Sequence, residues 1–183
     1  MTRTPPSDTA LRVADLSQNA QHAFALRPDA AALTQIATTL ELSALRKLTF
    51  VGRVEPVGKT DWRLRARLGA TVVQPCVVTL EPVTTRIDQD IERQFIADYA
   101  DPEDPEVEMP ADETSEALGA WIDPAAVMQE ALALALPDYP RKTDAALGSV
   151  IHTKPGEAPM TDEDARPFAG LANLKAQLDN GED

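Results

Sequence analysis

Apolar and polar residues alternate along two neighbouring runs of the chain, at 45–57 and 62–68. In the first run the positions on one side are Leu48, Phe50, Gly52 and Val54. In the second run the apolar positions are Trp62, Leu64, Ala66 and Leu68, and the positions between them are Arg63, Arg65 and Arg67. A period of two is typical of half-buried strands, and the glycine-containing VGKTD between the runs predicts an antiparallel hairpin.

Further β-prone segments follow at 70–80 and 83–97. Pro75 and Pro82 limit these segments to edges or turns, because proline cannot donate to a sheet ladder. Upstream of the hairpin, the sequence QHAFAL around His22 also predicts a strand.

Three segments have helical periodicity instead. The segment 29–42 follows Pro28 and begins at Asp29, a residue type that caps helices. In the second, Asp123 and Pro124 form an N-cap and first-turn pair, and an apolar helix over 124–136 ends at Pro137. The third, 167–178, places one apolar stripe on a short C-terminal helix.

These elements predict an α+β fold built on a mainly antiparallel sheet. We expect the helices at 29–42 and 124–136 to pack on the same face, because only the Leu48, Phe50, Leu64 and Leu68 side offers enough apolar area. The expected organisation is an N-terminal extension (1–19), a core domain (20–137) that carries an acidic mobile loop (98–118), and a linker with a short C-terminal helix (138–183).

Charge is distributed unevenly along the chain. Between Asp98 and Glu116 there are nine acidic residues and no lysine or arginine, which favours an extended loop. The formal charge of the whole chain is −13, so extensive wrapping by nucleic acid is excluded and any RNA contact must be a local patch. With neither an apolar secretory segment nor a run long enough to span a bilayer, the expected location is the cytoplasm, without membrane contact.

The residues that commonly carry catalysis or bind metal are scarce. Cys76 is the only cysteine, and it could be a nucleophile, a metal ligand or a packed core thiol. The two histidines, His22 and His152, are distant from it in the sequence, and four ligands for zinc are not available. No glycine-rich phosphate-binding motif occurs. We therefore expect no enzyme, no cofactor, no metal and no small-molecule substrate.

The stripe Arg63, Arg65 and Arg67, joined across the hairpin by Lys47 and Arg53, is the most distinctive candidate for binding. Alternate positions of a strand project from one face at intervals of about 7 Å, close to the spacing of successive phosphates. Three interpretations stay open: an RNA contact formed by Arg53, Arg63, Arg65 and Arg67, an ordinary solvated face, or intramolecular pairing with the acidic loop.

Three motifs resemble the YceD family of large ribosomal RNA subunit accumulation proteins. They are the CVVTLEPV turn with Cys76, Leu80, Glu81 and Pro82, the IDPAAVMQEALALALP helix ending at Pro137, and the closing PFAGLANLK with Pro167 and Phe168. Relatives commonly carry Cys-x-x-Cys at the first motif, whereas this chain has Cys76 and Thr79 there, so a metal role is not carried over.

The resemblance implies a non-enzymatic accessory factor in large ribosomal subunit biogenesis. Such a factor would promote the accumulation or processing of 23S-type rRNA by binding rRNA or a basic large-subunit ribosomal protein. The alternative is an acidic adaptor that binds a basic partner without contacting RNA.

Overall fold

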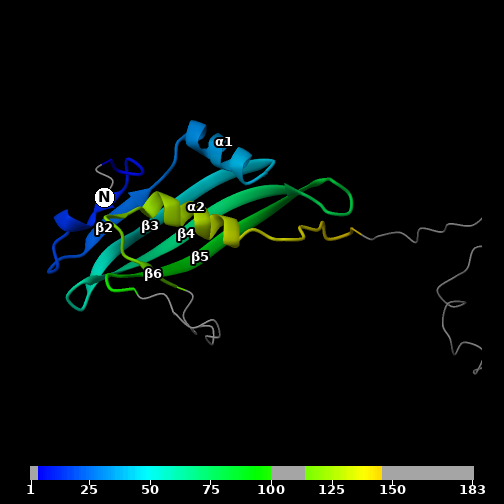
Figure 1. Cartoon of the computed structure of the whole chain (residues 1–183). Coiled ribbons are helices and arrows are strands. Elements are labelled where there is room, and N and C mark those ends of the chain that lie inside the picture. The colour runs from blue at the N-terminus through cyan, green and yellow to red at the C-terminus, as the bar shows by residue number, and fades with distance from the viewer. Residues whose placement is uncertain (1–3, 100–113, 146–183) are drawn as a thin grey trace, which may run out of the picture. The chain divides into compact units, whose positions relative to one another are not determined.

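The protein is described from a computed structural model, which describes residues 4–99 and 114–145. Its main feature is a five-stranded sheet in the order β2–β3–β4–β5–β6, antiparallel throughout except between β5 and β6 (Figure 1). A second, two-stranded sheet pairs β1 with β7. In chain order the elements are β1 (Leu11–Arg12), the 3-10 helix η1 (Val13–Asp15), β2 (His22–Leu26), α1 (Ala30–Thr39), β3 (Ala44–Val57), β4 (Asp61–Pro75), β5 (Pro82–Ile96), β6 (Ser115–Ala117), β7 (Trp121–Ile122) and α2 (Pro124–Leu134).

Both α-helices pack on one face of the large sheet, and the hydrophobic core lies between them and the sheet. The helices contribute Ile36, Ala37, Val127, Met128, Ala131 and Leu132 to this core. The sheet contributes fully buried side chains that include Phe50, Val54, Trp62, Leu64 and Leu68. Burial of each large apolar side chain stabilises the fold by about 1.5–3 kcal/mol. The α+β class with a mainly antiparallel sheet is therefore confirmed.

The predicted hairpin is formed by β3 and β4, which are joined by a tight turn. Their register begins at Val57 opposite Asp61 and extends to Ala44 opposite Val73. Gly58 in the turn has φ of 64°, a conformation that glycine adopts without the steric cost of a side chain. The period-two pattern predicted this hairpin because one face of the sheet is covered by helices and the other is not.

One irregularity interrupts the alternation near the start of β3. The register of β3 against β4 shifts between Arg46 and Thr49, and Lys47 has φ of 52°. The extra residue allows both Leu45 and Leu48 to be buried, although they are three positions apart. Lys47 lies in this bulge, outside the regular ladder.

Both helices begin at the predicted caps. The Asp29 side chain accepts a hydrogen bond from the Ala32 N–H at 2.8 Å, and the Asp123 side chain accepts one from the Ala125 N–H at 2.9 Å. Each aspartate satisfies one of the N–H groups that a helix leaves unpaired at its start.

The residues before position 20 contact the rest of the chain at several points. Leu11 and Arg12 pair with β7, and Leu11, Val13 and Leu16 pack against the core. The Ser7 hydroxyl also donates to the Asp123 carboxylate at 2.8 Å. These contacts join the segment 4–16 to the N-terminus of α2.

Two predicted segments lie wholly or largely outside the described residues. They are the C-terminal helix at 167–178 and most of the acidic loop at 98–118. The end of the loop is described, and there Ser115–Ala117 forms β6. Within residues 4–99 and 114–145, neither helix combines the length and apolar character needed to cross a bilayer.

Candidate functional site

The face of the sheet opposite the helices is polar and carries the predicted arginines. Side chains of directly opposed residues share a face, and Arg53 on β3 is opposite Arg65 on β4, which is opposite Glu92 on β5. Arg63 and Arg67 are two positions away on β4 and project from the same face. The structure thus brings together Arg53, Arg63, Arg65 and Arg67; we call this surface the arginine face.

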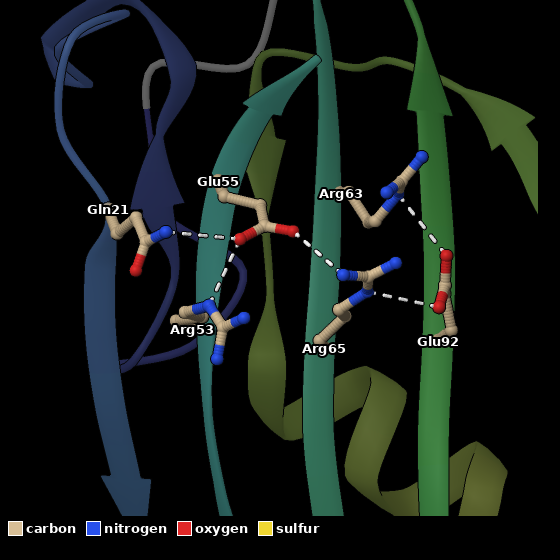
Figure 2. Close-up of polar contacts among 6 residues, drawn as sticks. All are labelled: Gln21, Arg53, Glu55, Arg63, Arg65 and Glu92. Atoms are coloured by element: carbon tan, nitrogen blue, oxygen red, sulfur yellow. Dashed lines mark hydrogen bonds and ion pairs between the residues drawn. The ribbon is translucent and has the colours of Figure 1, made fainter.

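Acidic side chains on the neighbouring strands connect Arg53, Arg63 and Arg65 into one network (Figure 2). Glu55 contacts Arg53 Nε at 3.0 Å and Arg65 Nη1 at 3.5 Å. Glu92 then contacts Arg65 Nε at 3.1 Å and Arg63 Nε at 3.2 Å. The two carboxylates therefore each bridge two guanidinium groups, and Gln21 from the chain before β2 donates to Glu55 at 3.3 Å.

Glu55 is the most enclosed member of this network. Its side chain is 14% exposed, whereas Arg53 and Arg65 are each exposed by more than 40%. A carboxylate that contacts two guanidinium groups keeps both arginines in place. Glu55 thus positions the arginines from the centre of the network.

Arg67 is the arginine least constrained by its neighbours. Its contact with Asp90 is 3.5 Å long, and the two side chains are 66% and 84% exposed. An ion pair this open contributes little to stability because water screens it. Arg67 is therefore the member of the face most available to a partner.

A fifth arginine, Arg86, extends the face toward the first residues of β5. Arg86 binds both carboxylate oxygens of Asp88 at 2.8 Å, which lowers the pKa of Asp88 and raises the pKa of Arg86. Its guanidinium also lies over Gly69, where an added Cβ would come within 2.8 Å of it. The absence of a side chain at Gly69 gives Arg86 room to lie flat on the sheet.

The charges of the whole face nearly balance. Cross-strand register places six arginines and five acids on it, which gives a net charge of +1: Arg46, Arg53, Arg63, Arg65, Arg67, Arg86, Glu55, Asp61, Asp88, Asp90 and Glu92. The alternation along β4 predicted the arginines, but not that Glu55 and Glu92 bridge Arg53, Arg63 and Arg65. The sequence did contain a pattern that could have indicated these contacts, because acids occupy alternate positions of β5. That pattern could be matched to the arginines of β4 only once the register of the two strands was known.

A shallow hollow of about 460 Å³ lies on this face between β3, β4 and β5. Arg53, Arg65 and Arg67 line it together with Asp90 and Glu92. It is open, and five of its nine lining residues are charged, so it suits an extended polar partner better than an enclosed small molecule, for which a deep and mainly apolar pocket is typical.

Cys76 lies at the other end of β4, in the turn that joins β4 to β5. Its N–H donates to the Glu81 carbonyl at 2.7 Å, and its carbonyl accepts from the Leu80 N–H at 2.9 Å. Leu80 has φ of 60° and is 78% exposed, so it is a turn residue rather than a core residue. Pro82 begins β5 directly after this turn.

The segment that follows α2 packs onto the same turn. The Val77 N–H donates to the Pro140 carbonyl at 3.0 Å, and Lys142 Nζ forms an ion pair with Glu81 at 2.6 Å. The Pro137 carbonyl accepts a hydrogen bond from Gln74 Nε2 at 3.3 Å. The structure therefore joins two family-motif regions, the CVVTLEPV turn and the end of α2, whereas Pro167 and Phe168 lie outside the described residues.

The Cys76 sulfur is buried and surrounded by hydrogen-bond donors. The backbone N–H groups of Thr79 and Lys142 each lie 3.5 Å from it. Hydrogen bonding by the Thr79 side chain, followed by these amides, lowers the pKa of Cys76 from 9.0 to about 6. Burial opposes this effect but does not cancel it.

Among the residues that the structure describes, neither a catalytic pair nor a metal site surrounds this thiol. His22 contacts Trp62 near the start of β4, at a ring-centroid distance of 5.9 Å, whereas Cys76 follows the last residue of β4. His152 lies outside the described residues. Across residues 4–99 and 114–145, no three His, Cys, Asp or Glu side chains come together as a metal site would need. Thr79 offers a hydroxyl where zinc would need a second thiolate, so this turn does not fit zinc.

These observations define an α+β protein with an open, charged sheet face and a turn anchored by one cysteine. The family model described as Large ribosomal RNA subunit accumulation protein YceD matches residues 64–175. The chain belongs to this family, whose name implies a role in the accumulation of large-subunit ribosomal RNA. Comparison with curated proteins and with solved structures gave no match to this chain.

Proposed function

We propose that this protein promotes the accumulation of large-subunit ribosomal RNA as a non-enzymatic factor that binds rRNA through the arginine face. The observation that carries the proposal is the family match, because residues 64–175 include most of β4, all of β5 and α2. Ribosomal RNA accumulates where ribosomes are made, so a cytoplasmic location is part of the proposal. It involves no cofactor, metal or small-molecule substrate.

Unused donors on the arginines support an RNA contact. A guanidinium group carries five N–H donors, and the Arg53 and Arg67 side chains each use one nitrogen in an ion pair on the face. The donors that remain can bind phosphate oxygens of an RNA strand laid along β4, where alternate side chains are about 7 Å apart.

The acids of the face limit how strongly it can bind RNA. The face has a net charge of +1 on a chain whose formal charge is −13, so it attracts a polyanion only at short range, and salt weakens that attraction. We therefore expect a modest affinity with a shallow salt dependence, in keeping with a transient assembly factor.

Replacement of Arg63, Arg65 and Arg67 with alanine tests this proposal. The triple variant should bind a large-subunit rRNA fragment at least tenfold more weakly, and the slope of log K against log salt should fall by about one for each phosphate that the variant no longer binds. The matched control replaces Arg12, Arg27 and Arg141, which are exposed and lie off the face, and therefore removes the same charge. If both variants bind rRNA equally weakly, the loss reflects only the change in net charge, and the arginine face is not the RNA-binding surface.

The second candidate function is an acidic adaptor that binds a basic large-subunit ribosomal protein without touching RNA. The charge of −13, with nine acids between Asp98 and Glu116, favours it. Binding assays with purified basic ribosomal proteins, in the presence and absence of nuclease, distinguish the two functions. A complex that persists after nuclease treatment and is unaffected by the triple arginine variant would favour the adaptor.

A further inference from the structure

The outer edge of β5 is open over most of its length. β5 runs from Pro82 to Ile96, but β6 pairs only with Gln94, Phe95 and Ile96. Figure 1 shows β5 at the border of the sheet with β6 beside one end of it. Within the described parts of the chain, no strand pairs with the outer side of residues 82–93.

The hydrogen bonds at the β6 end show which backbone groups face outward. The Gln94 N–H donates to the Thr114 carbonyl and the Ile96 carbonyl accepts from the Leu118 N–H, each at 2.8 Å. The N–H and C=O groups of these two residues therefore point away from β4. The β4–β5 ladder has no register shift, so the same alternation continues upstream. The outward-facing residues are Thr84, Arg86, Asp88, Asp90 and Glu92.

An open row of N–H and C=O groups can pair with another extended segment. Three of the five outward-facing residues are acidic, and they project from the arginine face: Asp88, Asp90 and Glu92. Asp90 is 84% exposed and has only the long contact with Arg67 among the described residues. The residues between them alternate onto the other face, where Ile87 is buried and Ile91 is half-buried.

These acids also decide against a second copy of this chain as the occupant. An antiparallel pair of β5 strands would place Asp88 and Asp90 close to the same residues of the other copy, and opposed like charges destabilise a strand pair. A segment that carries lysine or arginine at alternate positions has the complementary charge, and apolar residues at the other positions would cover Ile91.

We propose that the open edge of β5 receives an extended segment of a basic protein, in which cationic and apolar residues alternate, as an added strand. Such a segment would span at most about nine residues, because the outward-facing residues run from Thr84 to Glu92. The inference deepens the adaptor function proposed above, since it names the surface and the chemistry of the basic partner.

Synthetic peptides test whether the partner binds through backbone hydrogen bonds to the edge of β5. The probe is a seven-residue peptide that alternates lysine and valine, KVKVKVK, compared with two variants that are N-methylated either at every lysine or at every valine. A strand that adds to β5 turns only one of these two sets of N–H groups toward the edge. One variant should therefore lose binding to the full-length protein by at least tenfold while the other retains it. Equal binding by both variants would overturn strand addition.

Amide hydrogen exchange locates the contact. The unmodified peptide should slow exchange at three or four neighbouring members of the outward-facing set, which is Thr84, Arg86, Asp88, Asp90 and Glu92, because seven residues cover only that many. It should leave unchanged the intervening amides that already bond to β4. Asp90→Asn should weaken binding by about threefold, because one ion pair at an exposed site is removed. The matched control is Asp144→Asn, an exposed aspartate that lies outside the strands.

The outcomes separate this inference from the proposed function. If slowed exchange appears elsewhere, or if an rRNA fragment instead of the peptide protects the edge amides, the edge is not a site for a basic strand. Failure of the peptide with rRNA binding through the arginine face intact would overturn this inference alone. Loss of rRNA accumulation in cells that lack the protein would still support the proposed function.

Discussion

At the scale of single residues, Glu55 does most to organise the arginine face. It is the most enclosed member of the network and holds Arg53 and Arg65 on either side, with Gln21 as a third partner. Its charge keeps the arginines in place but also reduces the attraction of the face for a polyanion. Stability and binding therefore place opposite demands on this residue.

Glu55→Gln separates these two effects. The variant should lower the free energy of unfolding by about 1 kcal/mol, because a bridging carboxylate in a partly exposed network is removed. It should also raise the net charge of the face from +1 to +2 and strengthen rRNA binding about threefold. Denaturant unfolding and rRNA binding at fixed salt measure the two effects, and weaker rRNA binding in Glu55→Gln would contradict an RNA contact on this face.

Cys76 yields the second prediction at this scale. Its pKa is lowered to about 6, so its thiolate stabilises the fold fully above the ordinary thiol value of 9.0, and that contribution is lost as the pH falls through 6. The stability difference between wild type and Cys76→Ala should therefore grow as the pH rises from 6 to 9.

Thr79→Val tests the cause of that shift. The Thr79 side chain contributes most to the lowered pKa, so its removal should move the midpoint of thiolate formation upward toward 9.0. Ultraviolet absorbance of the thiolate follows the titration, and Cys76→Ala supplies the baseline. An unchanged midpoint in Thr79→Val would mean that the backbone amides alone lower the pKa of Cys76.

At the scale of the elements, the contact between β3 and β4 at Gly52 controls how the arginines are presented. An added Cβ at Gly52 would lie 2.2 Å from the Arg65 carbonyl oxygen and 2.5 Å from the Ala66 Cβ. Both are too close to be relieved without moving the backbone. Arg53 follows Gly52 in β3, and Arg65 is directly opposite Arg53 on β4. Any such backbone movement would therefore displace these two arginines.

Gly52→Ala should therefore destabilise the protein by about 2 kcal/mol, the usual cost of forcing an extra carbon into a packed site. Gly119→Ala is the matched control, because the nearest atom to its added Cβ is the Trp121 carbonyl oxygen at 3.9 Å. That change should stay within about 0.5 kcal/mol. Denaturant unfolding compares the two variants, and similar stability for both would show that β3 and β4 separate easily at Gly52.

At the scale of the whole molecule, charge sets the choice between RNA and a basic protein. Seven acids lie between residues 101 and 113, and their replacement by the corresponding amides changes the formal charge from −13 to −6. This variant should bind rRNA more tightly and a basic ribosomal protein more weakly, because long-range attraction follows the net charge. Titrations of both partners at two salt concentrations measure the effect, and no change for either partner would limit recognition to short-range contacts.

The alternation of side chains predicted much of the fold, but not how the charged residues interact. Period two in 45–57 and 62–68 fixed the hairpin and the side on which the helices pack, since a one-residue shift would have exposed Phe50 and Leu64. The caps at Asp29 and Asp123 were equally local signals. The bulge at Lys47 was not predicted, because nothing local distinguishes a residue inserted into a strand from one that continues it.

The sequence by itself determined the strand faces, the helix starts, the scarcity of catalytic side chains and the motifs that the family shares, because each depends on residues close together in the chain. Only the tertiary structure decided that Glu55 and Glu92 bridge the arginines, that the segment after α2 packs on the Cys76 turn, and that most of β5 has an open edge. These features depend on which strands are neighbours and in what register, and that is set by the packing of distant segments around one core.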